Sequence, residues 1–163
     1  GSVTNLAHEY FKILTKTNIV HVPYKGGGPA LTALIAGQVQ MSAISLVPTL
    51  PQVKAGKLRA IGITTPRRSP LLPDVPPIAE TVPGFQVIHW YGLWGPKGLP
   101  KRIVTLWNKE VAKVMATDEM KKRTQSEGLD VAAGPPEEFY KVIRDDVQKW
   151  RRVVKEAKIE TVD

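Results

Sequence analysis

The sequence of 163 residues contains no cysteine, which excludes disulfide bonds, thiolate nucleophiles and cysteine-ligated zinc sites. It also lacks any apolar run that approaches the roughly 20 residues of a membrane-spanning helix, and no signal peptide is recognisable. With 42% hydrophobic and 23% charged residues, the composition is that of a globular protein. The absence of cysteine fits an exported bacterial protein and a cytosolic one equally well, so composition leaves the compartment open.

Acidic residues are scarce in the first part of the chain. Residues 1–98 hold 9 Lys/Arg against 3 Asp/Glu, and residues 99–163 hold 14 against 12, so that +6 of the total charge of +8 lies in the first part. A positive field attracts anions but does not distinguish phosphates, carboxylates and lipid head groups. Aromatic residues make up only 7% and the basic residues are scattered, which argues against a nucleic-acid partner.

In the first half of the chain, segments with strand character alternate with segments of helical periodicity. Strands are predicted at residues 19–24, 38–45 and 58–64, where β-branched and apolar residues cluster. Strands that alternate with short helices imply right-handed βαβ crossovers, so the predicted fold class is α/β, with a mainly parallel sheet and flanking helices. The helical segments predicted here are an amphipathic helix behind Ser2 or Thr4, a helix from Pro29 to Gly37, and a short segment from Pro48 to Gly56.

The second half of the chain is predicted to be mainly helical after a proline-rich connection. Six prolines between Pro66 and Pro83 exclude a long regular element there, and an extended segment follows at residues 85–96. Helices are then predicted over residues 103–114, between Asp118 and Gly128, and from Pro136 onward. The residues expected on the buried side of the last helix are Phe139, Ile143, Trp150 and Val154.

The string YKGGGPAL places Gly26, Gly27 and Gly28 between a predicted strand and a predicted helix. Bare backbone N–H groups at the positive end of a helix would let an anionic oxygen approach. The alternative is a tight turn that needs glycine for a positive φ, and the motif alone does not choose between the two. Neither a G-x-G-x-x-G fingerprint nor a phosphate-binding G-K-[ST] loop is present, which argues against nucleotide binding.

Two further stretches have the composition of ligand-binding turns. Ser2 and Thr4 lie at the entry to the first helix, and Ser45 ends a predicted strand, although each of these hydroxyls has an alternative role as a helix cap. In a parallel sheet, the turns from strands to helices lie at one edge, where α/β proteins bind their ligands. We therefore expect these stretches and the glycine turn to meet at one pocket.

Catalytic and metal-binding patterns are absent from the sequence. His8, His21 and His89 are not at metal-ligand spacings and are expected to be surface or packed side chains. No G-x-S-x-G nucleophile motif is present, and the adjacent acidic pairs of the last helix point apart. We expect no catalytic residue, no metal ion and no cofactor. The four tryptophans are expected to pack in hydrophobic cores, with the lining of a cleft as the alternative for Trp90.

Five longer strings match a known family in their order along the chain. They are GSVTNLAHEYF, HVPYKGGGPALTALIAGQVQ, VKAGKLRAIGITTPRRSPLLPDVPPIAET, GLWGPKGLP and PPEEFYKVIRDDVQKW. Together they resemble the tripartite tricarboxylate transporter receptors, the TctC or Bordetella-uptake-gene (Bug) family of periplasmic solute-binding proteins. The resemblance implies a type II periplasmic-binding-protein fold, in which two α/β lobes close on a small carboxylate that is then handed to a membrane permease.

The chain departs from the family pattern in length and at two positions. The family's chain is much longer, so this sequence is expected to be a fragment of a two-lobed receptor that begins inside the second lobe and lacks most of the first. The family often has His where Asn5 stands and Asp where Ile44 stands. Loss of that acid removes a partner for a ligand amine, which makes an amino-acid ligand a poorer fit.

The resemblance also assigns domains and binding residues. Residues 1–90 are expected to form the ligand-binding α/β domain of the second lobe, and residues 91–163 the crossover and carboxy-terminal helices that would pack on the first lobe. The positions that match the family's carboxylate-binding stretches are Ser2, Thr4, Tyr24, Lys25, Gly26, Gly27, Gly28 and Ser45.

The resulting prediction is a periplasmic protein that captures a small organic mono- or dicarboxylate for the membrane permease subunits of a tripartite tricarboxylate transporter. The principal alternative is the ligand-sensing domain of a transcriptional regulator with the same two-lobed architecture, although no helix-turn-helix is recognisable. An enzyme acting on an organic acid and a nucleic-acid-binding surface are weaker alternatives. As a single lobe, the fragment is expected to bind carboxylates poorly and to self-associate through the helices after Pro100.

Overall fold

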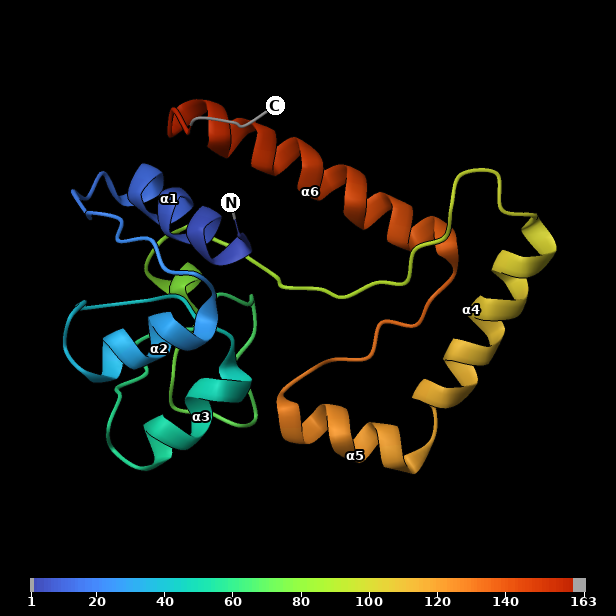
Figure 1. The fold of residues 1–163 in the computed structure, drawn as a ribbon, viewed down its shortest axis with the longest axis horizontal. Helices are drawn as coiled ribbons and strands as arrows, with labels where there is room; N and C mark the ends of the chain where they lie inside the picture. Colours follow the sequence, from blue (N-terminus) through green and yellow to red (C-terminus); the bar gives the residue numbers. More distant parts are fainter. Residues whose placement is uncertain (1, 160–163) are drawn as a thin grey trace. The chain divides into compact units, whose positions relative to one another are not determined.

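Helices dominate residues 2–159, the part of the chain that the structure, a computed structural model, describes (Figure 1). These residues divide into a first unit, residues 2–89 with 150–159, and a second unit, residues 90–149. The predicted assignment of residues 1–90 and 91–163 to parts of a two-lobed receptor stays a prediction. The helices are α1 (Val3–Thr15), α2 (Gly27–Ile35), α3 (Leu46–Lys54), the 3-10 helix η1 (Ile78–Glu80), α4 (Lys101–Met115), α5 (Asp118–Glu127) and α6 (Pro136–Glu156).

The capping residues account for most helix ends. The Ser2 hydroxyl accepts a hydrogen bond from the Asn5 N–H at the start of α1, as predicted. Thr117, rather than Asp118, caps α5, and Gly128 ends that helix with φ of 67°. The helix predicted from Pro29 begins two residues earlier, at Gly27, because the first turn of a helix tolerates proline.

The predicted parallel sheet is not confirmed. Within residues 2–159 the only backbone bridges are a parallel one between Ile63 and Pro77 and an antiparallel one between Ser69 and Leu72. The Val87 N–H donates to the Thr64 carbonyl at 2.9 Å, which adds one more contact of strand type. Residues 19–24 and 38–45 form no ladder, and the apolar side chain of Val20 is 80% exposed. Alternating apolar residues identify a chain that is able to pair, but a ladder also needs a neighbouring strand in register.

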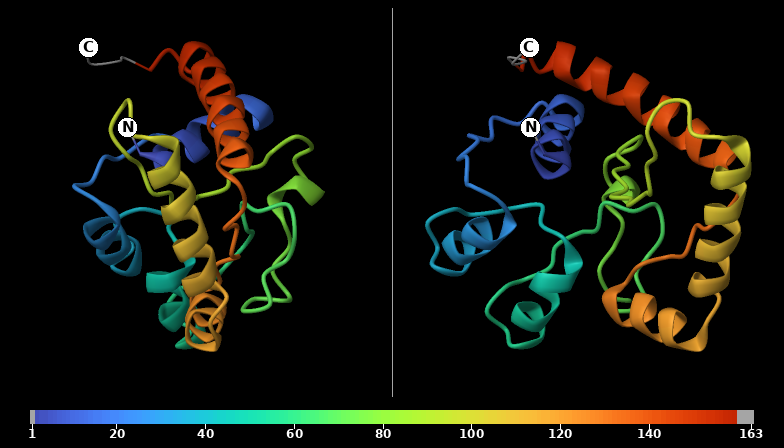
Figure 2. Two further views of the ribbon diagram at one scale, coloured as in Figure 1. Left: turned by 90° about the vertical axis from the view of Figure 1, so that its right-hand side faces the viewer. Right: turned by 45° about the vertical axis from the view of Figure 1, so that its right-hand side comes forward.

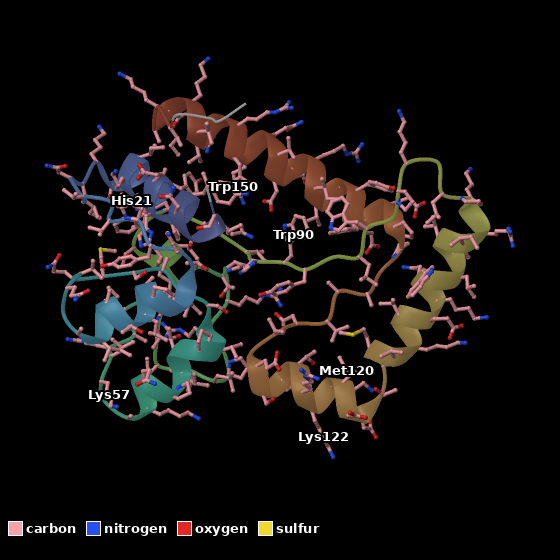
Figure 3. The ribbon with its side chains drawn as sticks, in the orientation of Figure 1. His21, Lys57, Trp90, Met120, Lys122 and Trp150 are labelled. Carbon is pink, nitrogen blue, oxygen red and sulfur yellow. The ribbon has the colours of Figure 1, made fainter. Side chains whose placement is uncertain are left out.

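The core of the first unit joins α1, residues 85–87 and the end of α6. Its fully buried side chains are Ala7, Tyr10, Phe85, Val87 and Val153. The Tyr10 ring stacks on Phe85 at 5.6 Å between centroids, and Trp150 points from α6 toward α1 to meet the Tyr10 ring edge-on at 6.4 Å (Figure 3). On α6 it is Val153 that is completely buried, whereas the predicted Val154 is only half-buried.

Replacing Tyr10 with Phe should lower the free energy of unfolding by about 1 kcal/mol. The Tyr10 hydroxyl donates to the Gly84 carbonyl at 2.8 Å, and the substitution keeps the buried ring but removes this donor. Urea unfolding followed by circular dichroism measures the change. Tyr140→Phe is the matched control, since Tyr140 is exposed and should be neutral to this substitution. Equal stability of the Tyr10→Phe variant and the parent protein would contradict the assigned role of the hydrogen bond.

The second unit contains α4, α5 and the first part of α6. Phe139 of α6 packs edge-on against Trp90 at 5.1 Å between ring centroids, and the Trp90 indole N–H donates to Asp146 at 2.6 Å. The prediction that all tryptophans pack in cores is wrong for Trp94 and Trp107, which are both exposed. No residue of α4 is fully buried: Ile103 and Val111 are half-buried, whereas its apolar residues Leu106, Trp107 and Val114 are exposed.

Candidate ligand-binding site

The three stretches predicted to bind a ligand precede or begin the first three helices, all within the first unit. Ser2 precedes α1, Gly26 precedes α2 and Ser45 precedes α3. In Figures 1 and 2 the first residues of these three helices lie on the same side of the first unit, and each helix extends away from that side. Their positive dipole ends therefore share one side of the unit, although no sheet edge aligns them there.

The glycine turn leaves its backbone open. Gly26 has φ of 106° and donates its N–H to the Tyr24 carbonyl at 2.9 Å, so the tight-turn alternative holds at this position. Gly27 and Gly28 do not have positive φ, and a Cβ atom added to either would meet no atom within 4 Å. Because the first N–H groups of a helix have no carbonyl partner within it, an anion can approach these two residues directly. Lys25 is exposed beside them.

The two hydroxyl-bearing stretches differ from each other. The Ser2 hydroxyl caps α1 and lies 2.7 Å from the Thr4 hydroxyl, so the capping alternative holds for Ser2. Ser45 is exposed, and its side chain makes no capping hydrogen bond to α3. The Ser45 carbonyl accepts a hydrogen bond from the Thr49 hydroxyl at 3.0 Å. Because the Ser45 hydroxyl is exposed and does not cap the helix, it faces solvent or a ligand. Of the two, Ser45 is therefore the better placed to contact a ligand.

His8 is a residue of this region that the sequence analysis did not select. Its Nε2 accepts a hydrogen bond from the Ala43 N–H at 2.9 Å, which ties α1 to the segment that leads into Ser45. Burial lowers the pKa of the His8 imidazole, so the side chain is neutral at pH 7. The position of His8 on α1 gave no signal for this role, because its partner is a backbone group 35 residues away.

Residues 2–159 provide neither a metal site nor a membrane-spanning helix. They contain no group of three or more His, Cys, Asp or Glu side chains that could hold a metal ion. None of their helices has both the length and the hydrophobicity needed to cross a membrane.

Comparison with known proteins identifies the family. The profile of the tripartite tricarboxylate transporter family receptor (TctC) matches residues 1–159. The chain belongs to this receptor family. A Pseudomonas sp. protein from the tcbD-tcbE intergenic region is 32% identical over 161 residues, which are 98% of this chain and 48% of the relative. BugT of Bordetella pertussis is 31% identical over 158 residues, which are 96% of this chain and 48% of BugT. The chain thus spans about half the length of these curated relatives.

Solved structures of TctC-type proteins resemble the chain over nearly its whole length. An R. palustris protein solved with adipate has a TM-score of 0.88 and 33% identity, covering 99% of this chain and 55% of that one. MatC from Rhodopseudomonas palustris with bound malate has a TM-score of 0.77 and 33% identity, covering 94% and 53%. The periplasmic binding protein BugD has a TM-score of 0.83 and 30% identity, covering 96% and 54%. The chain therefore has the fold of a little more than half of each of these proteins, including the periplasmic binding protein BugD.

Proposed function

We propose that this chain forms part of a periplasmic solute-binding protein that captures a small organic mono- or dicarboxylate. The permease subunits of a tripartite tricarboxylate transporter would then receive the ligand. The observation that supports this most directly is the open backbone of Gly27 and Gly28 at the start of α2. A carboxylate can bind to backbone N–H groups only where no side chain blocks its approach. The glycine residues at the start of α2 leave these N–H groups accessible.

The charges of the first unit support an anionic ligand. Of its few acidic side chains, Glu9 is paired with Lys12 at 3.0 Å and Glu80 with Arg68 at 3.0 Å. Near Ser45, Ile44 has no charge that would bind a ligand amine. A ligand with carboxylate groups and no ammonium group therefore fits this surface best, which is consistent with the adipate and malate of the two R. palustris structures.

We assign the eight predicted positions to this carboxylate site with different roles. Gly27 and Gly28 would donate backbone N–H groups, Lys25 would attract the anion, and Ser45 would donate its hydroxyl. Gly26 supplies the positive φ that the turn requires. The remaining three positions, Ser2, Thr4 and Tyr24, would shape the wall of the site.

The full receptor is proposed to have two lobes. In that arrangement residues 1–90 belong to the second lobe, with a mainly parallel sheet that is paired in the whole protein, and residues 91–163 form the crossover and the helices that would pack on the first lobe. The end of α6 is an exception, because Trp150 and Val153 pack with Tyr10 in the core of the first unit. A receptor longer than this chain is supported by the solved structures, since the chain covers little more than half of each of them. Ligand capture between two such lobes requires no catalytic group. None of the relatives or structures compared above is a regulator, so nothing favours the alternative of a transcriptional sensor.

A thermal-shift screen of the proposed full-length receptor tests the ligand class, since the single lobe alone is expected to bind poorly. Adipate, malate and other mono- and dicarboxylates should raise the melting temperature, because a ligand that binds only the folded state stabilises it. Amino acids and neutral sugars of similar size serve as controls and should leave it unchanged. If amino acids or sugars stabilise the protein while carboxylates do not, the proposed ligand class is wrong.

A further inference from the structure

The His8 imidazole joins two of the stretches that form the candidate site. Its Nε2 accepts a hydrogen bond from the Ala43 N–H at 2.9 Å, and the backbone of Thr4, one turn earlier in α1, raises the pKa of the ring. Thr4 lies in the first turn of α1, whereas Ala43 lies two residues before Ser45. His8 is therefore the side chain that connects the entry of α1 to the segment that positions Ser45.

This connection exists only for the neutral ring. A nitrogen that accepts a hydrogen bond cannot also bear a proton, so the ring must be protonated at Nδ1 alone. A second proton on Nε2 would place two N–H groups opposite each other at Ala43. The hydrogen bond would then be replaced by repulsion, and residues 43–45 would lose their tie to α1.

The surroundings of His8 favour the neutral form. Burial is the largest influence and lowers its pKa, and the electrostatic influences of His21 and of Lys12 on α1 act in the same direction. His21 lies beside α1 in Figure 3. The Thr4 hydrogen bond and the Glu9 carboxylate raise the pKa, but Glu9 is also paired with Lys12 at 3.0 Å, and the net pKa is lowered. The folded state thus resists protonation of His8 near neutral pH, and the ring takes up its second proton only in acid.

We propose that His8 is a positioning residue, whose neutral imidazole holds Ser45 in place for the ligand and whose protonation in mild acid releases the carboxylate. This inference rests on the proposed function, since it concerns the same site. A simple charge effect would act in the opposite direction, because a new positive charge attracts an anion. The sign of the pH dependence therefore separates positioning from attraction.

Two substitutions test the proposal. His8→Gln keeps an acceptor near the position of Nε2 but does not titrate, and His8→Leu removes the acceptor at every pH. The three forms are prepared in the proposed full-length receptor, and the Kd for malate and for adipate is measured calorimetrically at about pH 7.5 and about pH 5.5, on either side of the ordinary histidine pKa. Any protonation of the ligand itself affects all three proteins equally, so the ratio of Kd values between wild type and His8→Gln isolates His8.

We expect wild type and His8→Gln to bind within about 3-fold of each other at neutral pH, with His8→Leu about 10-fold weaker. In mild acid, wild type should bind about 10-fold more weakly than His8→Gln. A ratio between wild type and His8→Gln that does not change with pH, or that favours wild type in acid, would overturn the proposal.

A second measurement does not depend on ligand binding. The amide signals of Ala43 and Ser45 in the unliganded protein should titrate with His8 in NMR spectra of wild type and should not titrate in His8→Gln. Signals that titrate equally in both proteins would overturn the positioning role even if no carboxylate binds. Absence of binding by every variant at neutral pH, with a normal Ala43 titration, would instead contradict the proposed function and leave the His8 tie established.

Discussion

In the proposed full-length receptor, Gly27→Val should weaken carboxylate binding by about 10- to 100-fold, since hydrogen bonds to a charged group contribute about 1.5–3 kcal/mol. A Cβ atom at Gly27 meets no protein atom within 4 Å, so the added side chain will occupy the space through which the ligand approaches. The φ of Gly27 is not positive, so valine can adopt the backbone conformation and the protein should fold normally. Calorimetric titration with adipate or malate measures the loss, and circular dichroism verifies the fold.

Ala36→Val is the matched control for this experiment. Ala36 is exposed at the other end of α2, with a right-handed helical conformation that accepts valine. The same increase in side-chain size there should leave affinity unchanged. Unchanged affinity in a folded Gly27→Val variant would show that the glycines serve only the turn, and the proposed site would have to be abandoned.

We expect the parent chain to self-associate, and replacing Leu106 and Trp107 of α4 with Glu should make it monomeric. These side chains are 53% and 61% exposed, and exposed apolar surface of this extent tends to be covered by association. The same unit also exposes Tyr91, Leu93 and Trp94. We expect a dimer or larger assembly of the parent chain at micromolar concentration, and a mass near 18.0 kDa for the double variant in light scattering.

Val20→Glu combined with Ile61→Glu provides the control for association. Both residues are exposed and apolar, and two Glu residues are again introduced, so the added charge is the same. They differ from Leu106 and Trp107 in lying in the first unit. This variant should retain the mass of the parent assembly. A parent chain that is monomeric would contradict the prediction, and dissociation by the control alone would move the interface to the first unit.

Local sequence patterns predicted the helices well because their causes lie within a few residues. The Ser2 hydroxyl reaches the Asn5 N–H within one turn, and Gly128 ends α5 through its own φ. Helix α4 includes the predicted residues 103–114, and α6 begins at the predicted Pro136. Patterns of this kind require no knowledge of the rest of the chain.

Predictions that depend on distant partners succeeded less well. The apolar periodicity of α6 identified its buried side. Val153 is the residue of this side that is completely buried, and this depends on where Tyr10 and Phe85 of other segments lie. Strand pairing has the same requirement, and the alternation at residues 19–24 could not show that a neighbour would be in register.

The sequence by itself determined the helical segments, the glycine turn ahead of α2 and the membership in the receptor family. Only the tertiary structure decided that the Ser45 hydroxyl does not cap α3 and that Gly27 and Gly28 face open space. It alone brought His8 to the Ala43 N–H, across 35 residues of chain. The physical reason is that capping and turn formation are local interactions, whereas burial and hydrogen bonds between segments depend on how the chain folds back on itself.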